Sequence, residues 1–435
     1  MKRPIKWLNA EIDQWVGEGI IEAQQGQAIK KRYPAPVEEP AWGRIIFFSI
    51  GAILFGLGVI LIFAYNWQRM HKFVKLAVIF AALIGAHGAG FWLRRPNSAH
   101  RVTGEGFHLL GTMFFGAGIW LIAQIYHIEA HYPTAFLIWG IGALAMAWSL
   151  PSIAHGIGTT LLFVLWNCFE AFDFKDPHLI SPFLILGGIM PLAWIRRSRV
   201  LVAVGLIGYL ATLFVSVSAI EGDLAALVIF FNACILIAMS LVVKQRNLFP
   251  EIGTVFSFSG FCLYLAMLFI LSFFHRGKGT WSVHFDQFMQ SLFFFSYALA
   301  AIGSWAWAIW PTRKKRTWSA NPINKEYYGV WVTLIVMILN TLGLISLGGW
   351  LGMAVFNILF LYQCIIMIAS GCKTLNLKTT VTGCVLFAVI AMTRYTDLFF
   401  SLLARSLVFF IAGAALFSVG LYYSRSKKQL ERETR

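Results

Sequence analysis

Ionisable and amide side chains flank an apolar stretch, residues 104–132, that is long enough to cross a lipid bilayer. Glu105 and His108 lie near its first end. Its second end carries a closely spaced polar group: Gln124, His127, Glu129 and His131. Such groups are costly at membrane depth, so they need partners, water or a function. The side chains at the second end suit proton transfer, recognition of a polar ligand or metal coordination.

Metal coordination is the least supported of these chemistries. His127, Glu129 and His131 alternate, so an extended segment would project all three to one side, whereas a helix would align only His127 with His131. Zinc needs at least three protein ligands, and no third one is positioned by a helical spacing. We therefore predict no metal and no cofactor. Gln124 and His127 share a helical face and suit a proton path, while Glu105 and His108 are expected to cap a helix and pair with nearby basic residues.

Further polar residues are predicted at the same outer level of the membrane. We expect one outward-facing, ligand-binding cavity lined by Asn66, Trp67, Gln124, His127, Glu129, Glu170, Asp173, Arg394, Asp397 and Arg405. Its arginines would supply bidentate contacts to an anionic or sugar-bearing ligand. The alternative is structural: Arg394 with Asp397, and Arg405 with Glu129 or Glu170, would be ion pairs that hold helix ends together. No residue is assigned a catalytic role.

Composition identifies the class of protein that must position these residues. The chain has 435 residues, of which 59% are hydrophobic and 12% charged, whereas an ordinary soluble domain carries about 25% charged residues. This composition predicts an all-α, polytopic integral membrane protein. The six cysteines form no CxxC pair and are expected to be free thiols. No phosphate-binding loop, dinucleotide fingerprint or hydrolase motif occurs in the sequence.

About fourteen apolar runs approach the roughly 20 residues that a transmembrane helix requires. They are residues 45–65, 73–93, 107–126, 134–150, 152–171, 179–195, 200–219, 224–243, 252–274, 287–310, 328–347, 351–371, 377–393 and 404–424. Only Pro151 separates the fourth run from the fifth, so these two are either full spans or a re-entrant pair.

The loop charges predict an orientation. The net charge is +16, and most of the 35 Lys and Arg fall in alternate loops. The positive-inside rule then places both termini in the cytoplasm. Because the charge is not gathered on one patch, nucleic-acid binding is not predicted. The densest basic run either sets the topology or binds anionic lipid headgroups; it consists of Arg313, Lys314, Lys315 and Arg316.

The chain divides into three predicted parts. Residues 1–44 are expected to form a cytoplasmic helical hairpin with an unknown protein partner, since Leu8, Ile12, Trp15 and Val16 recur at helical spacing. Residues 45–424 form the transmembrane domain, and residues 425–435 form a basic cytoplasmic tail.

Three segments carry a family resemblance. The first is WVGEGII at 15–21, with residues 28–33 and Asn66–Trp67; the second is GEG at 104–106 with QIYH at 124–127; the third is RYTD at 394–397 with LLARS at 402–406. These segments resemble the bacterial predicted membrane protein family known as domain of unknown function 2157. The resemblance implies a protein of the bacterial cytoplasmic (inner) membrane and carries no activity with it.

The leading functional hypothesis is a transporter-like or flippase-like protein that handles a polar or amphipathic molecule. It rests on the span number, the intramembrane ionisable residues and a weak internal repeat between residues 51–62 and 111–122. One alternative is a membrane enzyme that acts on a lipid-linked substrate at the outer face, with His127 or Glu129 as base. The other is a non-catalytic scaffold or sensor. A transporter needs a cavity that reaches the bilayer midplane, an enzyme needs a shallow site at one interface, and a scaffold needs neither.

Overall fold

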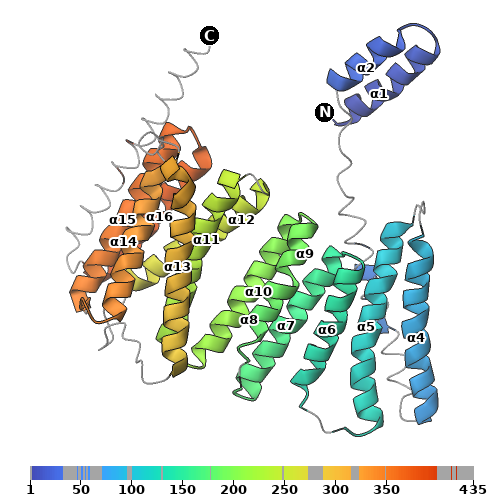
Figure 1. The fold of residues 1–435 in the computed structure, drawn as a ribbon, viewed down its shortest axis with the longest axis horizontal. Coiled ribbons are helices and arrows are strands. Elements are labelled where there is room, and N and C mark those ends of the chain that lie inside the picture. Colours follow the sequence, from blue (N-terminus) through green and yellow to red (C-terminus); the bar gives the residue numbers. More distant parts are fainter. Residues whose placement is uncertain are drawn as a thin grey trace. The chain divides into compact units, whose positions relative to one another are not determined.

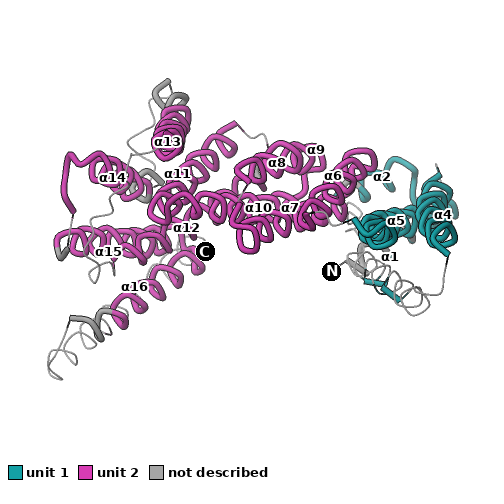
Figure 2. The backbone as a smooth tube through the Cα atoms, turned by 90° about the horizontal axis from the view of Figure 1, so that it is seen from below, with its two compact units in different colours: residues 1–130 teal, residues 131–435 magenta. Residues whose placement is uncertain are grey.

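The fold was analysed in a computed structural model. It describes residues 2–32, 71–95, 100–128, 131–176, 178–246, 249–272, 288–314, 323–347 and 349–398, with single positions between 47 and 58 and at 413 and 418. These residues form helices and no strands, which confirms the predicted all-α membrane class. They separate into two compact units, residues 1–130 and 131–435 (Figure 2). The predicted domain boundaries at 44/45 and 424/425 lie outside the described residues.

Unit 1 begins with two short amphipathic helices, α1 (Lys2–Gly17) and α2 (Ala23–Arg32). They pack against each other over the buried side chain of Ile12, and Lys30 pairs with Asp13 across them. Gly19, with a φ of 73°, makes the turn between the helices in a backbone conformation that side chains disfavour.

The other part of unit 1 is a pair of long apolar helices, α4 (Lys72–Leu93) and α5 (Arg101–Ile125). Each contributes a histidine that packs on a glycine of the other, His87 on Gly111 and His108 on Gly90. The two Nδ1 atoms lie 3.1 Å apart. His108 is fully buried in this contact. The expectation of a capping role for His108 is therefore wrong. His108 lies seven residues after Arg101, the first residue of α5, and packs between the two helices.

Unit 2 opens with α6 (Pro133–Ser149) and α7 (Ile153–Asp173), which lie side by side (Figure 1). Pro151 falls in the turn between them. The hydroxyl of Ser152 accepts a hydrogen bond from the His155 amide and so caps the start of α7. The fourth and fifth predicted runs are thus two separate helices that pack along each other.

The sixth predicted run, residues 179–195, is not one continuous helix. It divides into α8 (Ser181–Gly188) and α9 (Met190–Ile195), which meet at Ile189. Pro191 has no amide hydrogen, and its ring would clash with the carbonyl of Gly187 in a continuous helix. The run is still one apolar helical segment, Ser181–Ile195, and the interruption at Ile189 follows from this proline, which apolar length alone does not reveal. α10 (Arg199–Ser218) follows, capped by the Ser198 hydroxyl.

The centre of unit 2 is α11 (Gly222–Arg246), which is apolar on all sides. A helix with this pattern is expected to be buried, and α11 contacts α10, α12, α13 and α14 (Figure 1). The remaining helices are α12 (Pro250–Ser272), α13 (Phe288–Lys314), α14 (Ile323–Thr341), α15 (Gly349–Lys373) and α16 (Leu377–Leu398).

Within the described ranges, seven helices are long and apolar enough to cross a membrane. Four shorter apolar helices accompany them: Pro133–Ser149, Ser181–Ile195, Tyr327–Thr341 and Leu377–Thr393. The first and last predicted runs, 45–65 and 404–424, lie almost wholly outside the described residues. The multi-pass architecture is confirmed, and the number of fourteen spans stays a prediction.

Candidate functional site

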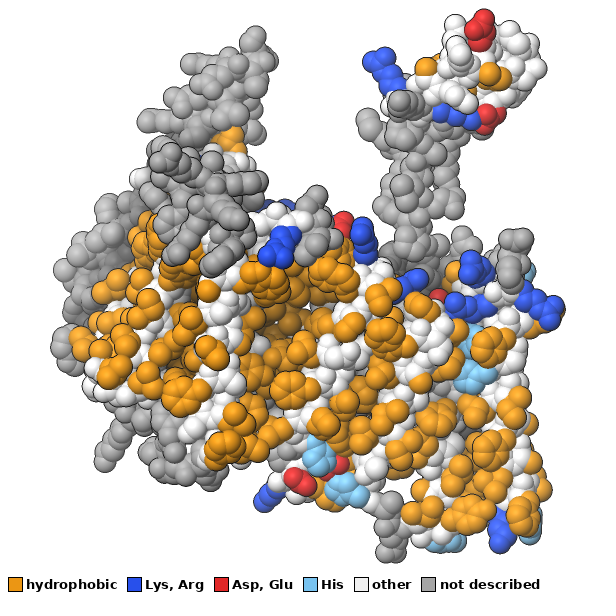
Figure 3. All heavy atoms as spheres, viewed as in Figure 1, with side chains coloured by type: hydrophobic (Ala, Val, Ile, Leu, Met, Phe, Trp, Pro, Cys, Tyr) orange, Lys and Arg blue, Asp and Glu red, His pale blue; other side chains and the backbone are white. Residues whose placement is uncertain are grey.

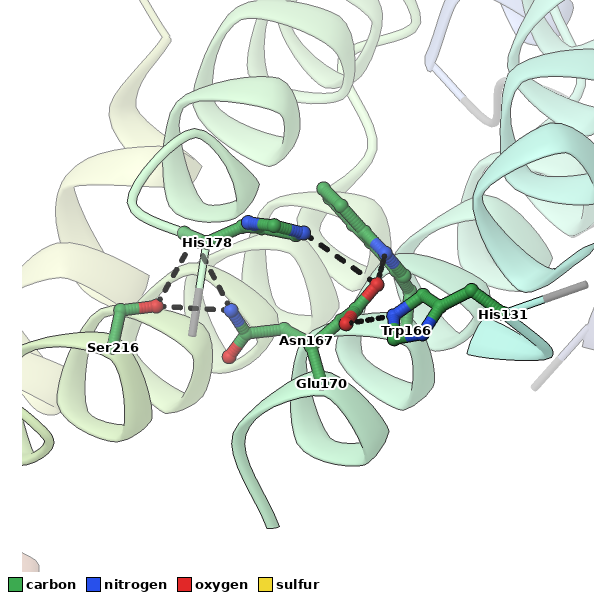
Figure 4. Close-up of polar contacts among 6 residues, drawn as sticks. All are labelled: His131, Trp166, Asn167, Glu170, His178 and Ser216. Atoms are coloured by element: carbon green, nitrogen blue, oxygen red, sulfur yellow. Dashed lines mark hydrogen bonds and ion pairs between the residues drawn. The ribbon is translucent and has the colours of Figure 1, made fainter. Parts of the chain in front are cut away.

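A buried carboxylate stands at one end of α7. The side chain of Glu170 is only 2% exposed, and two imidazole rings and an indole contact it (Figure 4). His131 Nε2 lies 2.5 Å from Oε2, Trp166 Nε1 donates to Oε1 at 3.0 Å, and His178 Nε2 lies 3.5 Å from Oε1. We call these four residues the Glu170 cluster. A buried carboxylate is tolerated when it is paired and hydrogen-bonded in this way.

Two further contacts fix the surroundings of the Glu170 cluster. Asn167, one residue along α7 from Trp166, donates from Nδ2 to the His178 carbonyl at 3.2 Å and to Ser216 Oγ of α10 at 2.9 Å (Figure 4). The Ser216 hydroxyl also donates to the His178 carbonyl. The loop that carries His178 is thereby attached to both α7 and α10.

A surface hydrogen bond lies beside the cluster. The Tyr132 hydroxyl, at the start of α6, donates to the carboxylate of Asp173, the last residue of α7. This bond, together with the negative charge of Asp173, raises the pKa of Tyr132 to about 12. The ring of Tyr132 also packs on Phe169. These contacts join the adjacent ends of α6 and α7.

The cluster has the geometry of an oriented base. Glu170 is buried, whereas the side chains of His131 and His178 are 42% and 36% exposed. A carboxylate that holds one ring nitrogen leaves the other nitrogen of the imidazole in a fixed direction, which is how such pairs serve in acid–base catalysis. The same contacts also hold three segments together: α7, the turn before α6 and the loop before α8.

The predicted site residues are distributed over both units. Gln124 and His127 belong to unit 1 and are exposed, while Glu170 and Asp173 belong to unit 2. Within unit 2, the structure brings Glu170 and Asp173 to the same end of α7. That all ten predicted residues line one cavity stays a prediction.

The other predicted residues fall at the edges of the described chain. Arg394 and Asp397 lie in the last turns of α16. Asn66, Trp67, Glu129 and Arg405 lie outside the described residues, as do Lys315 and Arg316 of the predicted lipid-headgroup run. The other two residues of that run, Arg313 and Lys314, end α13.

The alternating pattern at 127–131 is not a helical ligand pair. α5 ends at Ile125, and His127 has a φ of 52°, so His127 and His131 are not one turn apart on a helix. His131 contacts Glu170 instead. Among the residues that the structure describes, no group of three or more His, Cys, Asp or Glu side chains could hold a metal ion.

Sequence reasoning missed most partners of Glu170. The sequence does not single out His178 or Trp166, and it marks His131 only as a member of the polar group at 124–131. Trp166 lies one helical turn before Glu170, a spacing that brings two side chains together. That spacing was a usable signal. The position of His178 depends on how the loop folds back onto α7, for which the sequence has no comparable pattern.

A second feature of unit 2 is a cavity of about 550 Å³, which we call the α10 cavity. Its walls come from α8 to α13, and both halves of the broken helix contribute: Phe183 and Leu186 from α8, Met190 and Trp194 from α9. The lining is mainly apolar. Figure 3 shows a recess of hydrophobic side chains between α13 and the broken helix.

The polar side of the α10 cavity is a set of three residues, the polar triad Tyr209, Asn232 and Tyr297. Tyr209 of α10 donates to Asn232 Oδ1 of α11 at 3.0 Å, and its hydroxyl lies 3.3 Å from that of Tyr297 on α13. Tyr209 is about 15 Å along α10 from Arg199 at 1.5 Å per residue, about half the thickness of a bilayer core. The polar triad therefore lies near the middle of the helices.

Comparison with known proteins identifies the class of this protein but no activity. Neither a curated protein nor a solved structure shows significant similarity to this chain. Residues 13–156, which include α4, α5 and α6, match the model of a family described as predicted membrane protein (DUF2157), so the resemblance seen in the sequence is confirmed over that part of the chain.

Proposed function

We propose that this chain is a transporter-like or flippase-like protein of the inner membrane, with both termini in the cytoplasm, and that the α10 cavity takes an amphipathic molecule. The observation that carries the proposal is the broken helix α8–α9 in the cavity wall. Membrane transporters form substrate sites from interrupted helices near the bilayer midplane, where a helix break frees backbone groups and allows movement.

The dimensions of the cavity agree with this function. It extends from Trp194 and Ile252, at one end of the helices, to the polar triad near their middle. A shallow enzyme site would not need this depth, and a scaffold would not need the polar triad. Buried tyrosine and asparagine side chains at mid-membrane give a polar group a place to form hydrogen bonds on its way through hydrocarbon.

Lipid flux in proteoliposomes tests the proposal. Vesicles that contain the purified chain and trace phospholipid with a fluorescent chain are treated with dithionite, which quenches the outer leaflet only. We expect dithionite to remove more fluorescence than the outer leaflet contains, because labelled lipid from the inner leaflet reaches the outer leaflet. Vesicles without protein give the baseline.

A pair of matched variants links flux to the cavity. Leu206→Trp fills the cavity from α10, whereas Ile207→Trp adds the same ring to the next residue, which is 68% exposed and faces away from the cavity. We expect Leu206→Trp to return flux to the baseline and Ile207→Trp to leave it unchanged. Equal flux in the two variants would count against the cavity as the route.

The Glu170 cluster favours a second candidate function, an enzyme that acts at the outer face with His131 as the base. Glu170 orients His131 at 2.5 Å, and the histidine is partly exposed at that end of the helices. Mass spectrometry of a recovered lipid-linked substrate separates the two functions, since a transporter returns the molecule unaltered whereas an enzyme changes its mass.

A further inference from the structure

One end of the α10 cavity, which we call its mouth, lies beside strongly basic helix ends. Trp194 and Ile252 line this end. Arg196 and Arg197 follow Trp194 directly after α9, and both are exposed. Lys244 and Arg246 end α11, and Figure 3 shows Lys and Arg side chains gathered at this end of the unit 2 helices.

Only part of this charge is neutralised by the protein. Arg199 Nη2 lies 2.7 Å from Glu251 Oε1, which joins the starts of α10 and α12. Glu251 is the one acidic side chain among the described residues of these helix ends, 194–199, 244–246 and 249–252. The excess positive charge on Arg196 and Arg197 therefore lies beside the mainly apolar lining of the α10 cavity.

We propose that the α10 cavity binds one anionic phospholipid, whose phosphate contacts Arg196 and Arg197 and whose acyl chain enters the cavity. The inference rests on the proposed function, because it names the class of molecule that the cavity takes. Charge and shape both support it. A guanidinium contacts phosphate through two parallel hydrogen bonds, and an apolar lining that runs about 10 Å along α10, from Val202 to Tyr209, suits part of a single hydrocarbon chain.

The packing of the cavity mouth fits a lipid headgroup. Trp194 packs edge-on against Phe249, with ring centroids 6.2 Å apart. The guanidinium carbon of Arg246 lies over the ring of Trp307, 4.9 Å from its centroid. Tryptophan and arginine at the level of lipid headgroups are typical of a membrane interface. The polar triad lies deeper in the cavity. It would contact the end of the acyl chain when the lipid is fully bound, and it would contact the headgroup while the lipid is being transferred.

Photo-crosslinking tests the lipid site by equilibrium binding, without flux. The full chain in nanodiscs is labelled with phosphatidylglycerol or phosphatidylcholine that carries a diazirine in one acyl chain, and mass spectrometry locates the labelled residues. We expect phosphatidylglycerol to label lining residues such as Met190, Leu236 and Met239 in preference to phosphatidylcholine. Equal labelling by both lipids, or labelling confined to exposed faces of the helices, would overturn the proposal.

Charge variants test the phosphate contact. Changing both Arg196→Gln and Arg197→Gln is expected to lower phosphatidylglycerol labelling roughly tenfold, toward the phosphatidylcholine level. Arg95→Gln, at an exposed basic position in unit 1, is the control and should leave labelling unchanged. Preferential labelling that survives the double substitution would refute the role of these two arginines.

Cavity variants test the position of the acyl chain. Leu206→Trp and Ala300→Trp fill the cavity from α10 and α13, with Ile207→Trp and Leu299→Trp as exposed neighbours. Both filling variants should lose labelling and both neighbours should keep it; two independent pairs guard against one variant that fails to fold. Labelling without lipid flux would refute transport and leave the lipid site standing. Flux without preferential labelling by phosphatidylglycerol would support transport and refute the anionic-lipid site.

Discussion

At the Glu170 end of unit 2, a buried carboxylate and an exposed carboxylate lie one helical turn apart on α7. Glu170 is removed from solvent, while Asp173, one turn later on α7, is exposed and receives the Tyr132 hydroxyl. Losing a buried hydrogen-bond partner costs about 1–3 kcal/mol because the buried groups left behind are unsatisfied, whereas an exposed pair contributes about 0–1 kcal/mol. We therefore expect Glu170 to matter more for stability than Asp173.

Tyr132 gives this end of the protein a measurable pH dependence. The hydrogen bond to Asp173 raises the pKa of Tyr132 from its ordinary value of 10 to about 12. The folded state thus holds the proton more tightly than the unfolded state. The resulting stabilisation is present below pH 10 and is lost as the pH rises through about 12.

Phenolate absorbance measures this titration. The difference between the wild-type protein and Tyr132→Phe, followed against pH, should show a midpoint of about 12. Asp173→Ala removes both the acceptor and the charge and should move that midpoint down toward 10. A midpoint near 10 in the wild-type protein would show that the hydrogen bond does not form.

At the residue scale, the sequence indicates which side chains are unusual for their position but not which partners they contact. Glu170 was identified because an acidic residue at the end of an apolar run is unusual. Its pairing with arginine is an expectation that involves Arg405, outside the described residues. The contacts actually seen come from His131 and His178, which reach Glu170 through the turn before α6 and the loop before α8. Sequence spacing does not encode such loop paths.

At the scale of elements, α4 and α5 show how small residues let membrane helices approach each other. Helices in lipid gain little from hydrophobic burial, so close contact through glycine supplies much of their attraction. Here the space above each glycine is filled by an imidazole of the facing helix, Gly111 by His87 and Gly90 by His108. The two rings also contact each other, and Phe91 meets His108 edge-on at 4.6 Å.

A matched pair of glycine variants tests this packing. A Cβ at Gly111 would lie 2.6 Å from His87 Nε2, whereas a Cβ at Gly88, on the same helix as His87, would meet no described atom within 4 Å. Both changes to alanine favour a helix by about 1 kcal/mol. Gly88→Ala should therefore be neutral or stabilising, while Gly111→Ala should lose about 1–3 kcal/mol to overpacking.

Hydrogen exchange of the α4 and α5 amides, read by mass spectrometry on the full chain, reports this local stability. We expect faster exchange in Gly111→Ala and unchanged or slower exchange in Gly88→Ala. Similar exchange in both variants would mean that the His87 ring moves aside at no cost.

Element prediction from the sequence is accurate for long apolar runs, and its errors have physical causes. The runs at 73–93, 200–219, 224–243 and 351–371 each correspond to one helix, because uninterrupted apolar length is the dominant signal for a span. The run at 179–195 divides at Ile189 because of Pro191. The α10 cavity could not be predicted from runs at all, since six helices contribute to its lining.

At the scale of the molecule, unit 2 separates its charges between the two ends of its helices. Arg196, Arg197 and Arg199 stand at one end, with Lys244 and Arg246. Glu170, Asp173 and Asp176 stand at the other end, where Figure 3 shows acidic and histidine side chains together. Positive residues are retained on the cytoplasmic side during membrane insertion. This separation supports the proposed orientation, with the Glu170 cluster outside and the mouth of the α10 cavity facing the cytoplasmic leaflet.

Labelling of single introduced cysteines tests that orientation. Lys175 follows α7 at the Glu170 end, and Gln245 lies in the last turn of α11 at the basic end; both are exposed. We expect a membrane-impermeant maleimide added to intact cells, with the outer membrane permeabilised, to label Lys175→Cys and to spare Gln245→Cys. Gln245→Cys should become reactive only after lysis. The unmodified chain measures reaction at the six natural thiols, of which Cys262 is exposed on α12. The reverse labelling pattern would place the basic end outside, and the anionic lipid would then have to enter the α10 cavity from the outer leaflet.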